Sequence, residues 1–139
     1  MANTRVWNKS EWDERNRRAI EEFRANGGKD GLILLTTTGA KSGLPRTTPL
    51  VYTTDSDRLI VIASKGGYAY HPDWYRNLVA NPEATVEHDS ERFRVRTIVA
   101  EGPERQRLFD QMAAKFPFFA GYQANTPRQI PVIILERIV

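Results

Sequence analysis

The stretch TTTGAKSGLPRTTPL, residues 36–50, is a turn rich in glycine and in hydroxyl side chains. Apolar residues before and after it predict two short strands, Leu32–Thr37 and Thr47–Thr53. Gly39 and Gly43 lie inside the turn, where glycine permits positive φ angles and lets a ligand approach the backbone. The stretch therefore predicts a β-hairpin whose turn is able to bind a small molecule.

The same turn carries two cations, Lys41 and Arg46. Its hydroxyl groups belong to Thr36, Thr37, Thr38, Ser42, Thr47 and Thr48. Backbone amides, hydroxyls and fixed cations together suit an anionic oxygen cluster such as a phosphate. A solvated hairpin loop has a similar composition, because turns of glycine, serine and lysine are common. The residues of this turn alone leave both interpretations open.

A second glycine turn, Ser64-Lys65-Gly66-Gly67, follows a predicted strand at Arg58–Ala63. A predicted helix then begins at Pro72, where the missing N–H of proline is harmless, and stops at Asn81-Pro82. This segment again places a cation in a glycine turn behind a strand. The two turns could converge on one anion.

The rest of the chain predicts strands at Ala84–His88, Arg92–Val99 and Ile130–Ile138, and a helix at Gly102–Lys115. An aromatic loop, Phe118–Tyr122, follows a helix-breaking proline. Six short strands with turn signals and interspersed helices favour a small mixed barrel.

Two charged segments each allow two interpretations. A basic amphipathic helix, ending at Asn26-Gly27-Gly28, could lie on a membrane surface, but its narrow apolar stripe favours packing on the barrel. Arg92, Arg94 and Arg96 alternate with less polar residues and could bind nucleic acid. We favour the solvent face of an edge strand that charge protects from aggregation.

The composition is that of an ordinary globular protein. The chain has 139 residues, 40% of them hydrophobic and 27% charged, which fits one compact domain with a real core. The net charge of +3 suits an anionic small molecule, a nucleic acid or an acidic membrane surface. The absence of cysteine excludes a disulfide, a thiolate metal site and a cysteine nucleophile.

Several other signals are missing from the sequence. No apolar signal-peptide region occurs, and no apolar run approaches the ~18 residues of a spanning helix, so we expect a cytoplasmic protein. No Rossmann or Walker glycine motif is present. His71 and His88 are the only histidines, and their spacing to carboxylates does not resemble a metal site, so no metal is expected.

The motifs resemble the deazaflavin (coenzyme F420)-dependent nitroreductase family, a branch of the split β-barrel flavin/deazaflavin oxidoreductases. The resemblance runs from Trp7 almost to the C-terminus, and the shared order and spacing make it specific. The matching residues are Thr36-Thr-Thr-Gly-Ala-Lys-Ser-Gly43, Pro45-Arg46, Pro49-Leu50, Ser64-Lys-Gly-Gly67, Pro72-Asp-Trp-Tyr75, Asn77-Leu78, Asn81-Pro82 and Arg128-Gln-Ile-Pro-Val132.

The resemblance implies an α+β, mainly β fold. This fold is a split β-barrel of about six strands with flanking helices, similar to the FMN-binding split barrels. Residues 1–139 would form a single domain, with an N-terminal helix and link at 1–30 and the barrel at 31–139.

The resemblance also implies an enzyme that binds coenzyme F420, a deazaflavin with a phosphate and an oligoglutamate tail. It would transfer a hydride from the reduced coenzyme to an electron-poor small-molecule acceptor, such as an enone, a quinone or a nitroaromatic compound. The protein would supply proximity and orientation. Lys41 and Arg46 would meet the phosphate and the tail, in line with the cations of the turn.

The same resemblance implies roles for further residues. Tyr122 and Ser64 are the candidate catalytic residues, and Phe116, Phe119 and Tyr122 would form a lid over the exposed deazaflavin face. The implied cofactor contacts are Lys41, Ser42, Gly43, Pro45, Arg46, Pro49, Leu50, Ile62, Ala63, Ser64, Lys65, Gly66, Gly67, Asp73, Trp74, Tyr75, Arg76 and Asn77.

Some positions depart from the family pattern. Ala40 stands where the family often has arginine, and Val51 stands where nitroreducing members have tyrosine. Phe116 and Phe119 replace two tyrosines of those members, so Tyr122 keeps the only hydroxyl of the three. An apolar acceptor such as an enone or a quinone therefore fits better than a nitroaromatic compound.

Two alternatives to this interpretation are kept. One is a split barrel that carries FMN, which would purify as a yellow protein. The other is a small basic barrel without enzymatic activity that binds nucleic acid or carries a cofactor. The favoured interpretation expects no nucleic acid, allows weak peripheral membrane contact, and expects a monomer or a homodimer.

Overall fold

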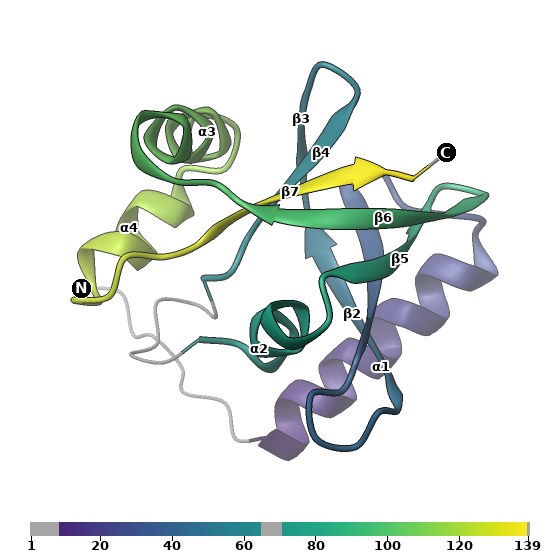
Figure 1. Ribbon diagram of the computed structural model, residues 1–139. Helices are drawn as coiled ribbons and strands as arrows, with labels where there is room; N and C mark the ends of the chain where they lie inside the picture. The colour runs from purple at the N-terminus through teal and green to yellow at the C-terminus, as the bar shows by residue number, and fades with distance from the viewer. Residues whose placement is uncertain (1–8, 65–70, 139) are drawn as a thin grey trace.

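The computed structural model describes residues 9–64 and 71–138. Helices are interspersed among the strands along the chain (Figure 1). In order they are α1 (Lys9–Ala25), β1 (Leu32–Thr38), β2 (Pro45–Val51), β3 (Thr53–Asp55), β4 (Arg58–Ile62), α2 (Asp73–Ala80), β5 (Glu83–His88), β6 (Glu91–Val99), α3 (Gly102–Lys115), α4 (Phe118–Ala124) and β7 (Val132–Arg137).

The strands form one curled antiparallel sheet in the order β2-β1-β5-β6-β7-β4-β3. The chain passes from β2 to β3 through Tyr52 alone, so the two outermost strands of the sheet are consecutive in the sequence. Within the described residues β2 pairs only with β1. Pro49 is tolerated in β2 because an edge strand does not need every N–H. The predicted split β-barrel is confirmed.

Among the residues that the structure describes, the sheet has seven strands, one more than predicted. The extra strand is β3, because the ladder changes partner at Tyr52. Before Tyr52 the chain pairs with β1, and after it Thr53 lies opposite Ile60 of β4. The sequence prediction had joined the beginning of β3 to β2.

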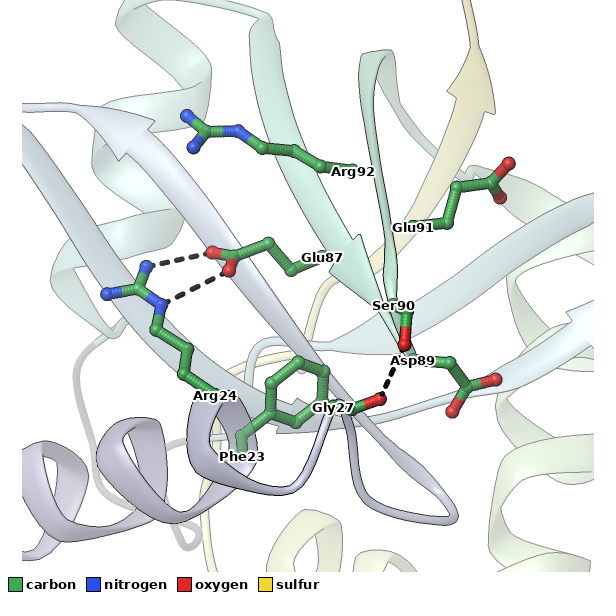
Figure 2. Close-up of a pocket in the computed structure, with 8 residues that line it drawn as sticks. All are labelled: Phe23, Arg24, Gly27, Glu87, Asp89, Ser90, Glu91 and Arg92. Atoms are coloured by element: carbon green, nitrogen blue, oxygen red, sulfur yellow. Dashed lines mark hydrogen bonds and ion pairs between the residues drawn. The ribbon is translucent and has the colours of Figure 1, made fainter.

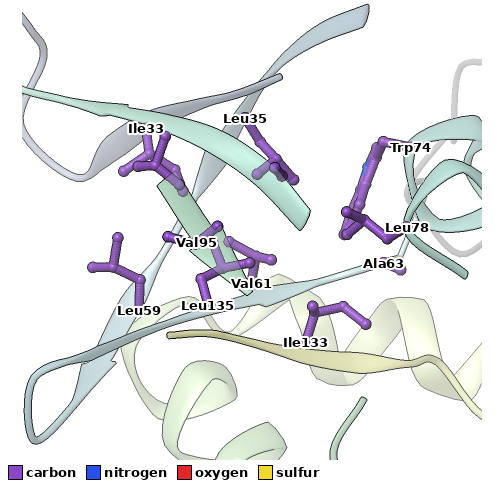
Figure 3. Packing of buried hydrophobic residues seen from close by; sticks show 12 residues of the cluster. Ile33, Leu35, Leu59, Val61, Ala63, Trp74, Leu78, Val95, Ile133 and Leu135 are labelled. Atoms are coloured by element: carbon purple, nitrogen blue, oxygen red, sulfur yellow. The ribbon is translucent and has the colours of Figure 1, made fainter. Parts of the chain in front are cut away.

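Alternation along the strands builds a hydrophobic core on each face of the sheet. In β4, Leu59 and Val61 belong to the first cluster, while Ile60 and Ile62 belong to the second. A strand buried on both faces reads as a continuous apolar run, as β4 does. Trp74 of α2 joins the first cluster and closes one end of it, together with Leu78 (Figure 3).

Helices α3 and α4 cover the second cluster. Leu108, Phe109 and Met112 of α3 are buried there, together with Phe119 of α4. The segment predicted as an aromatic loop is therefore a short helix, and that prediction was wrong. Burial of Phe119 explains how so short a helix is held, since tertiary packing supplies most helix stability.

Helix α1 packs along β2 and is fixed at its C-terminal end. Phe23 is buried, and Arg24 donates to both carboxylate oxygens of Glu87 in β5, at 3.1 and 2.8 Å. The helix ends where expected: the N–H of Gly28 bonds to the carbonyl of Phe23, and Gly27 has φ of +66°.

The arginines of β6 point to solvent as expected, but β6 is not an edge strand. It pairs with β5 on one side and with β7 on the other. The register places Arg92 opposite Glu87 and Arg96 opposite Glu83, so acidic and basic residues face each other across the strands. The third arginine, Arg94, lies opposite Thr85 and donates to its hydroxyl at 3.1 Å.

Candidate functional site

The glycine turn between β1 and β2 is compact. The N–H of Gly39 donates to the carbonyl of Leu44 at 2.8 Å, and the N–H of Gly43 donates to the carbonyl of Gly39 at 2.9 Å. Gly43 has φ of +70°, and a Cβ on Gly39 would lie 2.5 Å from the Ser42 hydroxyl oxygen. The positive φ therefore favours glycine at position 43, whereas a side chain at position 39 would force the Ser42 hydroxyl to move.

Asn77 of α2 holds this turn in place. Its side-chain oxygen accepts the N–H of Ala40 at 3.0 Å, and its side-chain nitrogen donates to the hydroxyl of Thr37 at 3.1 Å. Asn77 is buried. The resemblance implied a cofactor contact for Asn77, whereas both ends of its amide are used to anchor the turn.

The surface of the turn carries the chemistry expected of an anion site. The side chains of Lys41 and Arg46 are exposed. Within the described part of the chain, the backbone N–H groups of Lys41 and Ser42 have no hydrogen-bond acceptor. Two exposed cations beside two available amides fit the phosphate-bearing, acidic portion of a coenzyme.

The end of β4 forms the second part of the candidate site. Arg128 donates to the carbonyl of Ala63 at 3.1 Å and to that of Ser64 at 2.6 Å. It also lies 3.0 Å from Nδ1 of His71. Burial, followed by the positive charges of Arg128 and Arg76, lowers the pKa of His71. The imidazole is thus neutral near pH 7 and Nδ1 accepts from Arg128.

Helix α2 connects these two parts. His71, just before the helix, contacts Arg128 beside Ser64, while Asn77 within the helix binds the glycine turn. Eight residues of α-helix span about 12 Å. The fold therefore brings the first glycine turn and Ser64, at the end of β4, to the same helix.

The implied cofactor contacts fall into groups of different exposure. Lys65, Gly66 and Gly67 lie outside the described residues. The buried ones build the core behind the site: Ile62, Ala63, Ser64, Trp74 and Asn77. The half-buried ones are Pro49, Leu50 and Tyr75, and the exposed ones are Lys41, Ser42, Gly43, Pro45, Arg46, Asp73 and Arg76.

The lid residues separate into inner and outer positions. Phe119 is buried in the second cluster, and Phe116 and Tyr122 pack against that cluster half-exposed, as does Val51 of β2. The exposed aromatic is Phe118, at 46% exposure, with its ring centroid 4.6 Å from Phe119 and 5.4 Å from Tyr122. Sequence reasoning missed Phe118 because it took this segment as a loop. Helical spacing places residues 118 and 122 on one face.

The described residues also line two surface pockets away from this site. One, of about 210 Å³, lies between the end of α1 and the β5–β6 turn, where the Arg24–Glu87 ion pair crosses it (Figure 2). The other, of about 230 Å³, lies beside the β3–β4 turn. Neither contains an implied cofactor contact. Within residues 9–64 and 71–138, no three histidine, aspartate or glutamate side chains cluster as metal ligands would.

The sequence model of the family described as F420H(2)-dependent quinone reductase matches residues 9–137. The chain belongs to this family. An F420H(2)-dependent quinone reductase of Mycobacterium tuberculosis is 40% identical to it over 108 residues, which are 76% of this chain and 72% of that one. The family lies within the deazaflavin-dependent reductases that the sequence motifs resemble.

Two solved structures support the family assignment. A structure of the F420-H2 dependent reductase FDR-A has 38% identity and a TM-score of 0.72, covering 77% of this chain and 95% of that chain. A chain described as a domain-swapped dimer has 34% identity and a TM-score of 0.74, covering 93% of this chain and 100% of that chain.

Family membership settles the class of chemistry. This F420H(2)-dependent quinone reductase family member is an oxidoreductase, and its cofactor is coenzyme F420. The FMN-binding and non-enzymatic alternatives are set aside. The exposed cations and amides of the glycine turn fit the anionic portion of that coenzyme.

Proposed function

We propose that this protein transfers a hydride from reduced coenzyme F420 to a quinone or enone. The observation that carries the proposal is the glycine turn, which presents Lys41, Arg46 and two available amides and is anchored by Asn77. The names of the relatives support a quinone as the acceptor class. We further propose that residues 1–139 act as one domain, with residues 1–30 as helix and link.

When bound, the reduced coenzyme supplies the hydride. In the proposed arrangement, Lys41 and Arg46 bind its phosphate and acidic tail through charge-assisted hydrogen bonds. Pro49 and Leu50 of the edge strand β2 would flank the ring system, and Ser64 would line it from the end of β4. Holding both reactants in register supplies most of the rate gain expected of the protein.

The acceptor would lie between the coenzyme and α4. Phe116, Phe118 and Val51 offer it apolar contact, and Tyr122 offers a hydroxyl. A quinone or an enone has a carbonyl oxygen that becomes more basic as the hydride arrives, and a single well-placed donor stabilises it. A nitro group spreads the developing charge over two oxygens, so one donor serves it less well.

We also propose roles for the remaining contacts implied by the family pattern. Asp73, Arg76 and Tyr75 would form the wall along α2, and Ser42, Gly43 and Pro45 would line the glycine turn. Lys65, Gly66 and Gly67 would line the deazaflavin. The core residues Ile62, Ala63 and Trp74 would support this wall from behind.

The compartment, the membrane contact and the oligomeric state of the enzyme also belong to the proposal. No helix among residues 9–64 and 71–138 is both long and apolar enough to cross a bilayer. We propose a cytoplasmic enzyme with weak peripheral membrane contact, no nucleic-acid partner, and a monomeric or homodimeric state. The domain-swapped dimer at 34% identity supports testing the dimer first.

Steady-state turnover with reduced coenzyme F420 tests the proposal. A quinone, a cyclic enone and a nitroaromatic compound of similar size are compared as acceptors, with coenzyme oxidation followed optically. The proposal expects kcat/KM to be highest for the quinone or enone. Faster turnover of the nitroaromatic compound than of both others would overturn the assigned acceptor class.

A further inference from the structure

A polar network behind the candidate site is not explained by the roles above. Arg128 lies in the segment between α4 and β7, and its guanidinium donates hydrogen bonds to two consecutive backbone carbonyls. Nη1 donates to Ala63 and Nη2 donates to Ser64. Nη1 also donates to Nδ1 of His71. One side chain thus joins the end of β4 to the residue that leads into α2.

This fork is specific to arginine. A planar guanidinium reaches two neighbouring oxygens in one geometry, whereas a lysine ammonium is a single point charge. Burial lowers the pKa of Arg128, which reflects its position within the molecule rather than on the open surface. The Arg128 guanidinium is therefore a half-buried donor to the backbone carbonyl of Ser64.

The segment that carries Arg128 is itself fastened to the lid helix. Gln123 of α4 donates from Nε2 to the carbonyl of Arg128 at 2.8 Å, and its Oε1 accepts the N–H of Ile130 at 3.0 Å. Buried Arg105 of α3 donates to the same Oε1 at 2.9 Å and to the carbonyl of Ile130 at 2.7 Å. Both side-chain ends of Gln123 are used in this way.

We propose that Arg128 is a positioning residue for hydride transfer. It holds Ser64 in a fixed place relative to α4, because the same short segment is bound to Ser64 through the Arg128 side chain and to α4 through Gln123. The inference rests on the proposed function, because that function places Ser64 beside the coenzyme and α4 beside the acceptor. Arg128 acts through Ser64 and does not itself touch the reacting atoms.

The expected effect is on the chemical step rather than on binding. The cations of the glycine turn do not depend on Arg128, so coenzyme affinity changes little when Arg128 is replaced. A misplacement of about 1 Å costs rates on the order of 100-fold. Arg128→Lys should therefore lower kcat by about 10- to 100-fold while the coenzyme dissociation constant stays within about threefold.

The experiment compares wild type, Arg128→Lys, Arg128→Ala and Arg137→Ala. Arg137 is the control, because it is an exposed arginine of β7 that pairs with Glu91 away from the site. Guanidinium ion added at millimolar concentration should restore part of the kcat of Arg128→Ala and leave Arg137→Ala unchanged. A kcat of Arg128→Lys within twofold of wild type would overturn the inference. So would a loss of activity in Arg128→Ala that guanidinium ion does not restore and that parallels a fall in the thermal unfolding midpoint.

A measurement without coenzyme separates this inference from the proposed function. Nitrogen NMR of His71 reports its Nδ1 protonation in the unliganded protein. The pKa of His71 should rise in Arg128→Lys, because the directed contact at Nδ1 is lost, and an unchanged His71 titration would refute the contact. If Arg128→Ala fails to fold, Gln123→Leu replaces it, and unchanged kcat in that variant would contradict the link to α4. Wild type that does not bind coenzyme F420 would instead refute the proposed function.

Discussion

Tyr122 carries the only hydroxyl in α4. It lies half-exposed beside Phe118 and Phe119, with ring centroids 5.4 and 5.9 Å away, so its ring is held by aromatic packing. A hydroxyl on a well-packed ring is a pre-positioned donor. This residue is where the proposed acceptor preference is decided.

Replacing Tyr122 with phenylalanine removes the hydroxyl and keeps the ring. If the hydroxyl stabilises the developing oxyanion, kcat with an enone or quinone should fall by about 10- to 100-fold, below the ~100- to 1000-fold effect of an ideally placed donor. Coenzyme affinity should change little. Steady-state kinetics of both proteins decide this, with Tyr52→Phe as the control, because the Tyr52 hydroxyl contacts His88 and has no role in the proposed site. Full activity of Tyr122→Phe would make Ser64 the next candidate donor.

Individual residues were predictable where chemistry is local. The cations of the glycine turn follow from composition, and they are exposed as an anion site requires. The anchoring role of Asn77 was not predictable, because its partner Ala40 lies 37 positions away and only the tertiary fold brings them together. The inward side chain of Phe119 was missed for the same reason, since adjacent phenylalanines look equivalent in a sequence.

At the scale of elements, the glycine turn is separable from the core behind it. Lys41→Ala and Arg46→Ala should each weaken coenzyme F420 binding by about 1–3 kcal/mol, the scale of a lost charge-assisted hydrogen bond. Thermal stability should barely change, because exposed cations contribute little to folding. Titration calorimetry measures the affinities, with Lys29→Ala, on the link before β1, as control. Normal binding by either variant would assign that residue to a solvated loop.

The β3–β4 hairpin is joined to α3 through Asp55. Its carboxylate accepts from Arg107 at 3.1 and 3.3 Å and from Arg58 at 2.6 Å. Arg107 first, and then Arg58, lower the pKa of Asp55 to about 2, from an ordinary value of 3.8. The folded state therefore holds the charged form more strongly than the unfolded state does. This contribution to stability is present above pH 4 and is lost as the pH falls from about 4 to about 2.

Asp55→Asn should consequently lower the urea midpoint at pH 7, modestly because the pair is accessible to solvent. The difference from wild type should shrink towards zero as the pH approaches 2. Asp57→Asn, on the same turn, serves as control and should track wild type. A midpoint difference that stays constant between pH 7 and pH 2 would rule out the ion pair as its cause.

The elements themselves were largely predictable from hydrophobic alternation. β1, β5 and β6 match their predicted bounds to within a residue. The position of β6 inside the sheet was not predictable, because an alternating strand does not encode how many neighbours it has. α4 was missed because Pro117 and Gly121 are typical of loops, whereas burial of Phe119 holds a short helix there.

At the scale of the whole molecule, charge is balanced locally over much of the surface. On α1, Arg17 pairs with Glu14 and Glu21, each at 2.6 Å, and Lys9 pairs with Asp13 at 2.7 Å. The basic helix seen in the sequence thus has a mixed face. Its attraction to an anionic membrane is reduced accordingly, since paired charges present little net field.

Vesicle flotation checks this consequence. Binding to vesicles rich in anionic lipid should be weak at low salt and should vanish near physiological ionic strength, where the screening length is about 8 Å. Neutral vesicles are the control. Flotation that persists at high salt would contradict the balance described for α1, and it would favour an acceptor embedded in the membrane.

The measurement that tests the central claim most directly is a binding titration of the purified protein with coenzyme F420 and FMN side by side. The glycine turn, anchored by Asn77 and carrying two exposed cations, predicts that coenzyme F420 binds at least about tenfold more tightly, a difference of about 1.4 kcal/mol. Equal affinity for the two cofactors, or FMN retained through purification, would contradict the account.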